Sequence, residues 1–229
     1  MRVTMFEFKE ITDAVVRLCQ GAVRLKDDYV GGDTIQVGSN CLFFAGDEVE
    51  ISCGTEQKEI RRVLITQGLE TIQLDGPLSG TYTVDAGAQI RLISDELPTL
   101  NQVVTGVPET LFELSAGRLP CVVIAPQKLE QSSQGGTNRS MLQEYELAIT
   151  YLRARRGTEA EENAFLNEVG KLFNLLMSDP YLGGQCWHSW VRCAEHDRQL
   201  EQALRERGNA VRCMKLSLVC KVSALTGGS

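Results

Sequence analysis

The chain has 229 residues, of which 43% are hydrophobic and 23% charged, an ordinary composition for a globular protein with one large or two small cores. Its formal net charge of −7 argues against a nucleic-acid binder that works through a broad basic face. No apolar run approaches the roughly 20 residues that span a bilayer, and the N-terminus lacks the pattern of a signal peptide. We therefore expect an intracellular protein with no membrane partner, whose eight cysteines stay reduced.

The charge is distributed unevenly. Residues 26–96 hold 13 acids and 5 bases, whereas the rest of the chain holds 17 acids and 18 bases. This asymmetry is the first indication of two modules. We expect the acids of the middle segment to lie on solvated faces and turns, and ligand-binding carboxylates are the rarer alternative.

The first predicted element is an amphipathic helix over residues 5–23, because apolar residues recur there at helical spacing. Six short β-branched runs follow, separated by glycine- and aspartate-containing turns. They cover residues 34–37, 48–52, 60–66, 70–74, 81–84 and 89–93. This pattern predicts a small all-β unit, either a sandwich or a barrel.

The remaining residues alternate strands and helices. After a proline-containing transition over residues 97–117, with a short helix near 109–114, we predict strands at 121–125, 141–156, 185–195 and 210–222. Helices are predicted at 158–178, capped by Thr158 and Glu161, and at 197–207. The polar stretch 127–140 is expected to be an exposed loop.

These elements predict an α+β fold, in which a four-stranded sheet has helices packed on one face. The helix at 5–23 has no partner in the β unit, so we expect it to pack on that sheet. Residues 1–25 and 97–229 would then form one domain, and residues 26–96 an inserted β domain.

No catalytic signature was found, so we expect no enzyme activity, no cofactor and no metal. The one cluster that suits zinc consists of Cys186, His188, Cys193 and His196. Its C-x-H-x4-C-x2-H spacing matches no strong zinc pattern, and we favour incidental residues on a strand. A zinc-dependent enzyme that uses this cluster is the alternative from another class. A β module that binds a small ligand is a third.

Two further groups have both a functional and a structural interpretation. Tryptophan side chains stack nucleic-acid bases in some proteins. For Trp187 and Trp190, packing in the core or at a subunit interface is favoured. Arg153, Arg155 and Arg156 end a predicted strand. Three interpretations are open for them: contact with phosphate, a solvated strand end, or ion pairs with a neighbouring subunit.

Residues 119–222 resemble the tail terminator and head–tail joining proteins of tailed bacteriophages. The similarity rests on a strand opened by proline, a polar loop, a strand, a helix ending in "DPYLGG", a strand, a short charged helix and the closing strand "VRCMKLSLVCKV". The helix at 5–23 would supply that family's first helix. The minimal family fold lacks a β module as large as residues 26–96.

The resemblance implies a homo-hexameric ring that caps the tail tube and joins it to the neck, with DNA passing through its lumen without specific binding. It implies a virion protein of the tail or neck, assembled in the host cytoplasm, whose partners are the tail tube, a neck or connector protein and the sheath or another tail protein. A head–tail connector or stopper is the alternative within this class. Ring-interface candidates are Arg153, Arg155, Arg156, Trp187 and Trp190. Assembly-interface candidates, expected in the polar loop, are Lys128, Gln131, Ser132, Ser133, Gln134, Gly135, Gly136, Thr137, Asn138 and Arg139.

Overall fold

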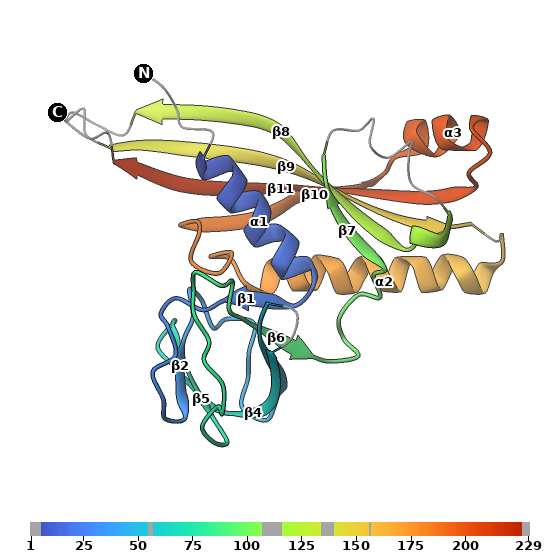
Figure 1. Cartoon of the computed structure of the whole chain (residues 1–229). Helices are drawn as coiled ribbons and strands as arrows, with labels where there is room; N and C mark the ends of the chain where they lie inside the picture. The colour runs from blue at the N-terminus through green and yellow to red at the C-terminus, as the bar shows by residue number, and fades with distance from the viewer. Residues whose placement is uncertain (1–5, 55–56, 107–115, 134–139, 156, 226–229) are drawn as a thin grey trace.

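The computed structural model of the chain describes residues 6–54, 57–106, 116–133, 140–155 and 157–225 (Figure 1). Strands account for 43% and helices for 22% of it, and the strands form one sheet of six and one of five. The fold is therefore mainly β. The expected four-stranded sheet with helices on one face is wrong, both in the number of strands and in the placement of the helices.

The six-stranded sheet is antiparallel and small. Its order is β1 (Ala22–Arg24), β6 (Gln89–Ile93), β3 (Glu48–Cys53), β4 (Gln57–Gln67), β5 (Thr71–Leu74) and β2 (Thr34–Gln36). A bridge between Leu25 and Val37 joins β1 to β2, and the Lys26 N–H donates to the Gln36 carbonyl at 2.9 Å. These contacts close the sheet, so of the two expected architectures the structure forms a barrel. We call this unit, strands β1 to β6, the barrel.

Five of the six expected β runs form barrel strands, and the run at 81–84 does not. Its backbone is hydrogen-bonded to the preceding loop instead of to a strand. The Tyr29 N–H donates to the Tyr82 carbonyl at 2.8 Å, and the Val84 N–H donates to the Asp28 carboxylate at 2.7 Å. Since each backbone group needs one partner, this loop replaces the ladder.

The five-stranded sheet has the order β10 (His188–His196), β11 (Val211–Leu225), β9 (Ser140–Ala154), β8 (Cys121–Ser133) and β7 (Gln102–Thr105). Strand β7 was not expected, because it lies in the proline-containing transition. It pairs in parallel with β8, whereas the other pairs are antiparallel. The short helix expected near residues 109–114 lies outside the described residues.

The helices cover both faces of this sheet. Helices α1 (Phe6–Cys19) and α2 (Glu159–Ser178) share one apolar cluster with alternate residues of β8, β9 and β11. Helix α3 (Arg198–Glu206) packs on the opposite face, where Leu204 joins Cys121, Leu152 and Cys213. Helix α3 packs against apolar residues of this opposite face, at the start of β8 and β11 and the end of β9.

Helix α1 ends earlier than expected. Gly21 has a φ of +70°, and its N–H donates to the Leu18 carbonyl at 2.8 Å, which is a common way for a glycine to terminate a helix. The next residues then enter β1. Helix α2 has the expected capping box of Thr158 and Glu161, and its C-cap is Asp179.

The barrel and the five-stranded sheet meet backbone to backbone. The carboxylate of Asp179, which is fully buried, accepts hydrogen bonds from the N–H groups of Tyr181 at 3.1 Å and Gly183 at 2.7 Å. This turn packs so closely on the barrel that a Cβ on Gly38 would lie 1.7 Å from the Gly183 carbonyl oxygen. One apolar cluster continues from the barrel strands through α1 and α2 to the sheet.

Candidate functional site

A charged groove lies at the end of the five-stranded sheet where α2 begins. It consists of two adjoining cavities of about 310 and 680 Å³ that share Arg155, Glu162 and Arg212. Five elements supply its walls, namely the end of β9, the start of α2, the end of β10, α3 and the start of β11. We call it the arginine groove, after Arg153, Arg155, Arg198, Arg205 and Arg212, which line it.

Arg212 holds the groove together. Its guanidinium pairs with Glu162 of α2 at 2.9 Å and with Glu201 of α3 at 3.5 Å. Glu201 is 6% exposed and also accepts the Cys213 N–H at 2.9 Å. Ion pairs that are partly removed from solvent are screened less than exposed ones. Arg212 therefore links both helices to β11.

The acids and the bases of the groove differ in their engagement. Glu162 and Glu201 pair with Arg212, Glu161 belongs to the α2 capping box, and Glu206 accepts a hydrogen bond from Gln202 at 3.2 Å. Glu159, the fifth acid of the lining, has no ion pair in the described residues. In the described part of the chain, by contrast, four of the arginines have no ion pair: Arg153, Arg155, Arg198 and Arg205. The groove therefore offers guanidinium donors to an acceptor from outside, and carboxylates and phosphates are the groups that such donors recognise best.

An aromatic stack lies beneath the groove. Phe165, which lines it, is tilted against Tyr151 at 5.6 Å between centroids and stacks with His196 at 6.0 Å. Burial raises the pKa of the Tyr151 hydroxyl, and Glu168 raises it further, so this group stays neutral. Buried aromatic rings therefore pack directly behind the groove.

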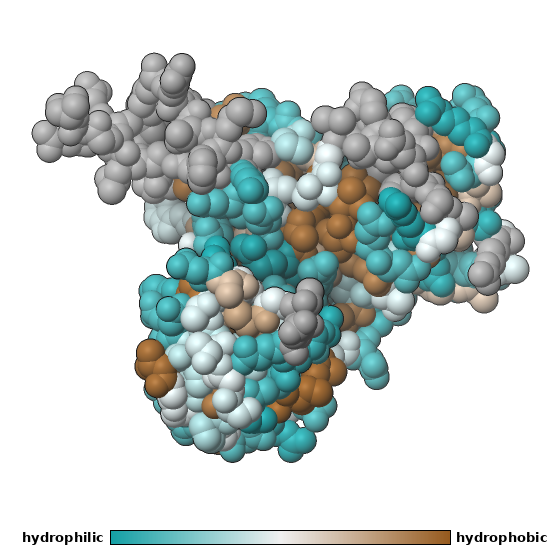
Figure 2. All heavy atoms as spheres, in the orientation of Figure 1, coloured by the Kyte–Doolittle hydropathy of each residue, from teal (hydrophilic) through white to brown (hydrophobic). Residues whose placement is uncertain are grey.

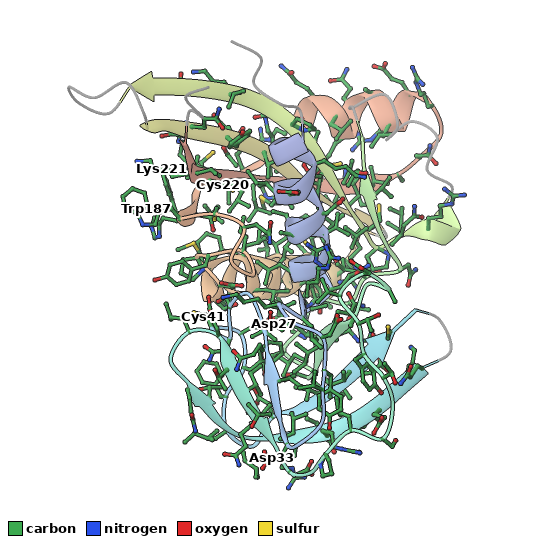
Figure 3. The ribbon with its side chains drawn as sticks, turned by 60° about the vertical axis from the view of Figure 1, so that its left-hand side comes forward. Asp27, Asp33, Cys41, Trp187, Cys220 and Lys221 are labelled. Carbon is green, nitrogen blue, oxygen red and sulfur yellow. The ribbon has the colours of Figure 1, made fainter. Side chains whose placement is uncertain are left out.

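Of the ring-interface candidates, Arg153 and Arg155 therefore lie in one groove, and Arg156 lies outside the described residues. The two tryptophans lie elsewhere. Trp187 is 62% exposed and precedes β10, and Figure 3 shows it at the outer edge of the molecule beside Lys221. Trp190 lies 5.0 Å beneath the Lys221 ammonium. Exposed tryptophan beside cationic residues is typical of protein–protein contact surfaces.

The expected polar loop is largely strand. Residues 127–133 continue β8 and pair with β9 as far as Ser133 opposite Met141. Of the loop candidates, Lys128 forms an ion pair with Glu130 on the strand, Gln131, Ser132 and Ser133 are strand residues, and residues 134–139 lie outside the described part. Polar side chains do not prevent a ladder, because the backbone groups bond to the next strand whichever side chain they carry.

The Cys and His residues considered for zinc are spread out. His188, Cys193 and His196 lie along the exposed length of β10, whereas Cys186 is buried with its thiol 3.5 Å from the Pro180 carbonyl. No group of three or more His, Cys, Asp or Glu side chains in the described residues is arranged to hold a metal ion. Likewise, none of the described helices is long and apolar enough to cross a membrane.

Sequence reasoning missed most of the groove. It identified Arg153 and Arg155 at a strand end, and it did not single out Arg198 or Arg212. No local pattern marks these residues, because the groove is assembled from elements that are far apart in the sequence. Neither a protein-family model nor a curated protein sequence matches the chain.

Proposed function

We propose that the protein is a tail terminator of a tailed bacteriophage, which forms a homo-hexameric ring that caps the tail tube and joins it to the neck. On this proposal the protein has a structural role: its residues form contacts between subunits and catalyse no reaction. The tail tube protein, a neck protein and another tail protein are its partners, and DNA passes through the ring.

The observation that carries the proposal is a three-stranded arm. The ends of β8, β9 and β11 run beyond the helices to one side of the molecule (Figure 1). The pairing of β8 with β7 stops at Ile124, so residues 125–133 of β8 have no described neighbour on that edge. The pairing of β11 with β10 stops at Lys221.

Unpaired strand edges of this length pair readily with another chain. Pro126 and the ion-paired Lys128 lie on the β8 edge, and such residues limit indiscriminate pairing. The arm is therefore suited to a specific partner in an assembly. The arginine groove, a separate surface with free donors, supports the same proposal, because ring-forming contacts join two different patches of the subunit.

Native mass spectrometry and negative-stain imaging of the purified protein, alone and with tail tubes, test the proposal. We expect a six-membered ring, free or at the tube end. A twelve-membered ring would favour a connector of the neck instead. A protein that forms no ring and leaves tail tubes uncapped would contradict the proposal.

Shortening the three-stranded arm tests whether the arm is needed for capping. A variant that lacks residues 131–136 removes the last three residues of β8 and leaves the rest of both sheets in place, so it should keep nearly all of the far-UV circular dichroism of the wild type. It should fail to cap tail tubes. A folded variant that caps them normally would refute the role of the arm.

A further inference from the structure

The end of the barrel that lies farthest from the five-stranded sheet is a built surface. We call residues 30–33 and 75–78 the barrel tip; Figure 3 shows Asp33 at this end. The Tyr29 hydroxyl ties its two loops together, since it donates to the Gly32 carbonyl at 2.6 Å and accepts the Leu78 N–H at 2.9 Å. The Leu74 N–H donates to the Asp33 carbonyl at 2.7 Å, which places Asp75 next to Asp33. The tip is therefore held in one shape before it meets any partner.

The tip combines negative charge with apolar surface. Val30 is 96% exposed, and Asp75 is exposed with no ion pair in the described part of the chain. The Asp33 carboxylate accepts hydrogen bonds from Gln73 at 2.8 Å and Thr34 at 3.1 Å, which lower its pKa, so it is charged at neutral pH. Acidic and apolar groups on one rigid projection favour a basic, partly apolar receptor.

The barrel as a whole has the character of a contact surface. Seven of the twelve large apolar side chains that are exposed among the described residues belong to it: Val30, Phe44, Ile60, Leu64, Ile65, Leu69 and Ile93. Figure 2 shows such apolar spots on its visible face, among hydrophilic residues. The barrel segment also holds the whole negative excess of the chain. A subunit that carries both features gains by docking on a surface with unpaired guanidinium donors.

The arginine groove is lined by five arginines and five glutamates, and it offers positive charge through the four arginines that have no ion pair in the described part of the chain. One subunit cannot use the groove on its own tip. The groove lies at the start of α2 and beside α3, whereas the barrel hangs below the opposite end of α2 (Figure 1). Its free guanidiniums are available to acceptors from outside. The unpaired guanidiniums of the groove complement the carboxylates of the tip, and the two surfaces lie on different parts of the same subunit.

We propose that the barrel tip of one copy docks in the arginine groove of the next copy, with Asp33 and Asp75 facing Arg155, Arg198 and Arg205. This inference rests on the proposed ring and names its subunit contact. A contact between two different patches repeats from copy to copy, and it closes into a ring when the rotation between neighbours allows it. It also gives a role to the barrel, the part of the chain that the minimal family fold lacks.

Charge reversal tests the contact. One variant carries Arg155→Glu and Arg205→Glu, and another carries Asp75→Arg. Sedimentation velocity over a range of concentrations at physiological salt should show self-association of the wild type, weakened by about tenfold or more in each variant. The matched controls are Arg118→Glu and Asp85→Arg, which reverse exposed charges outside the groove and the tip and should associate like the wild type.

A mixture of the two variants gives the decisive experiment. The Asp75→Arg copy keeps an intact groove, and the Arg155→Glu/Arg205→Glu copy keeps an intact tip, so an equimolar mixture should associate more tightly than either variant alone. Variants that associate as tightly as the wild type would overturn the inference. So would a wild type that stays monomeric in solution while a ring is imaged on capped tails, although the proposed function would then stand. A monomer that also leaves tails uncapped would contradict both the subunit contact and the proposed function.

Discussion

The barrel and the five-stranded sheet are both built from strands, yet different interactions hold them. In the sheet, β8, β9 and β11 are 13 to 15 residues long, and their inward residues are almost fully buried against α1 and α2. In the barrel, four of the six strands have five residues or fewer, and side-chain hydrogen bonds tie its loops. Asn40, for example, donates to the carbonyls of Gly68 at 3.3 Å and Thr71 at 3.0 Å.

This difference shows how one chain supports two kinds of surface. Long ladders and a deep apolar cluster allow an arm to project beyond the helices, because each strand is bonded to the next along its length. A small barrel with polar ties instead keeps short loops in one shape, so its tip is presented to a partner already ordered. Preorganised loops lose less conformational entropy when they bind.

The largest effect is expected at the junction between the barrel and the five-stranded sheet. Gly38→Ala places a methyl group against the Gly183 carbonyl, and relieving that overlap forces the two backbones apart. We expect a loss of about 3 kcal/mol in the free energy of unfolding. In a denaturant titration, the barrel and the sheet should then separate into two transitions.

Gly76→Ala is the matched control, because its added Cβ meets no atom within 4 Å and its φ is not positive. It should unfold like the wild type. If Gly38→Ala also unfolds in one transition at the wild-type midpoint, the backbone contact at Gly183 does not join the two units.

The polar ties of the barrel are tested at Glu59. This carboxylate, with a side chain only 12% exposed, accepts hydrogen bonds from the Ser79 and Gly80 N–H groups and the Tyr82 hydroxyl, each at 2.9 Å. Glu59→Gln turns an amide NH₂ toward some of these donors. We expect it to lower the free energy of unfolding by about 1–3 kcal/mol at pH 7.

The effect of Glu59 should depend on pH. Burial raises the pKa of its carboxyl, but the hydrogen bonds from Ser79, Tyr82 and Gly80 outweigh burial and lower that pKa in the folded protein. The stabilisation is therefore complete above the ordinary value of 4.5 and is lost as the pH falls through the lower folded value. Urea titrations of the wild type and Glu59→Gln should converge at low pH. A constant difference, or one that Glu48→Gln reproduces on the exposed side of β3, would contradict this account.

The elements that sequence reasoning predicted well are those with local causes. Tyr145, Leu147, Ile149 and Tyr151 alternate along β9, and a period of two places them on one face, which is buried in the structure. The capping box of α2 was likewise visible within four residues. These signals lie within one element, so no knowledge of the rest of the fold is needed.

The errors have long-range causes. The polar residues of β8 were expected to form a loop, but their backbone bonds to β9. Strand β7 has four residues, and only its parallel pairing with β8 makes it a strand. The arginine groove depends on five elements meeting, with Arg212 between Glu162 and Glu201. Two of its arginines were identified from their place at a strand end, and their shared site followed only from the fold.

Asp197 gives the smallest effect and tests whether the groove depends on the helix that carries two of its arginines. Its carboxylate caps α3 by accepting the Leu200 N–H at 3.0 Å. Asp197→Ala should cost about 1 kcal/mol in the free energy of unfolding, whereas Asp197→Asn keeps an acceptor and should cost little. Because Arg198 and Arg205 lie on α3, the alanine variant should also self-associate more weakly than the asparagine variant. Equal association of the two would mean that the arginine groove keeps its shape without this cap, because Leu204 and the contacts of Glu201 with Arg212 and Cys213 hold α3 in place.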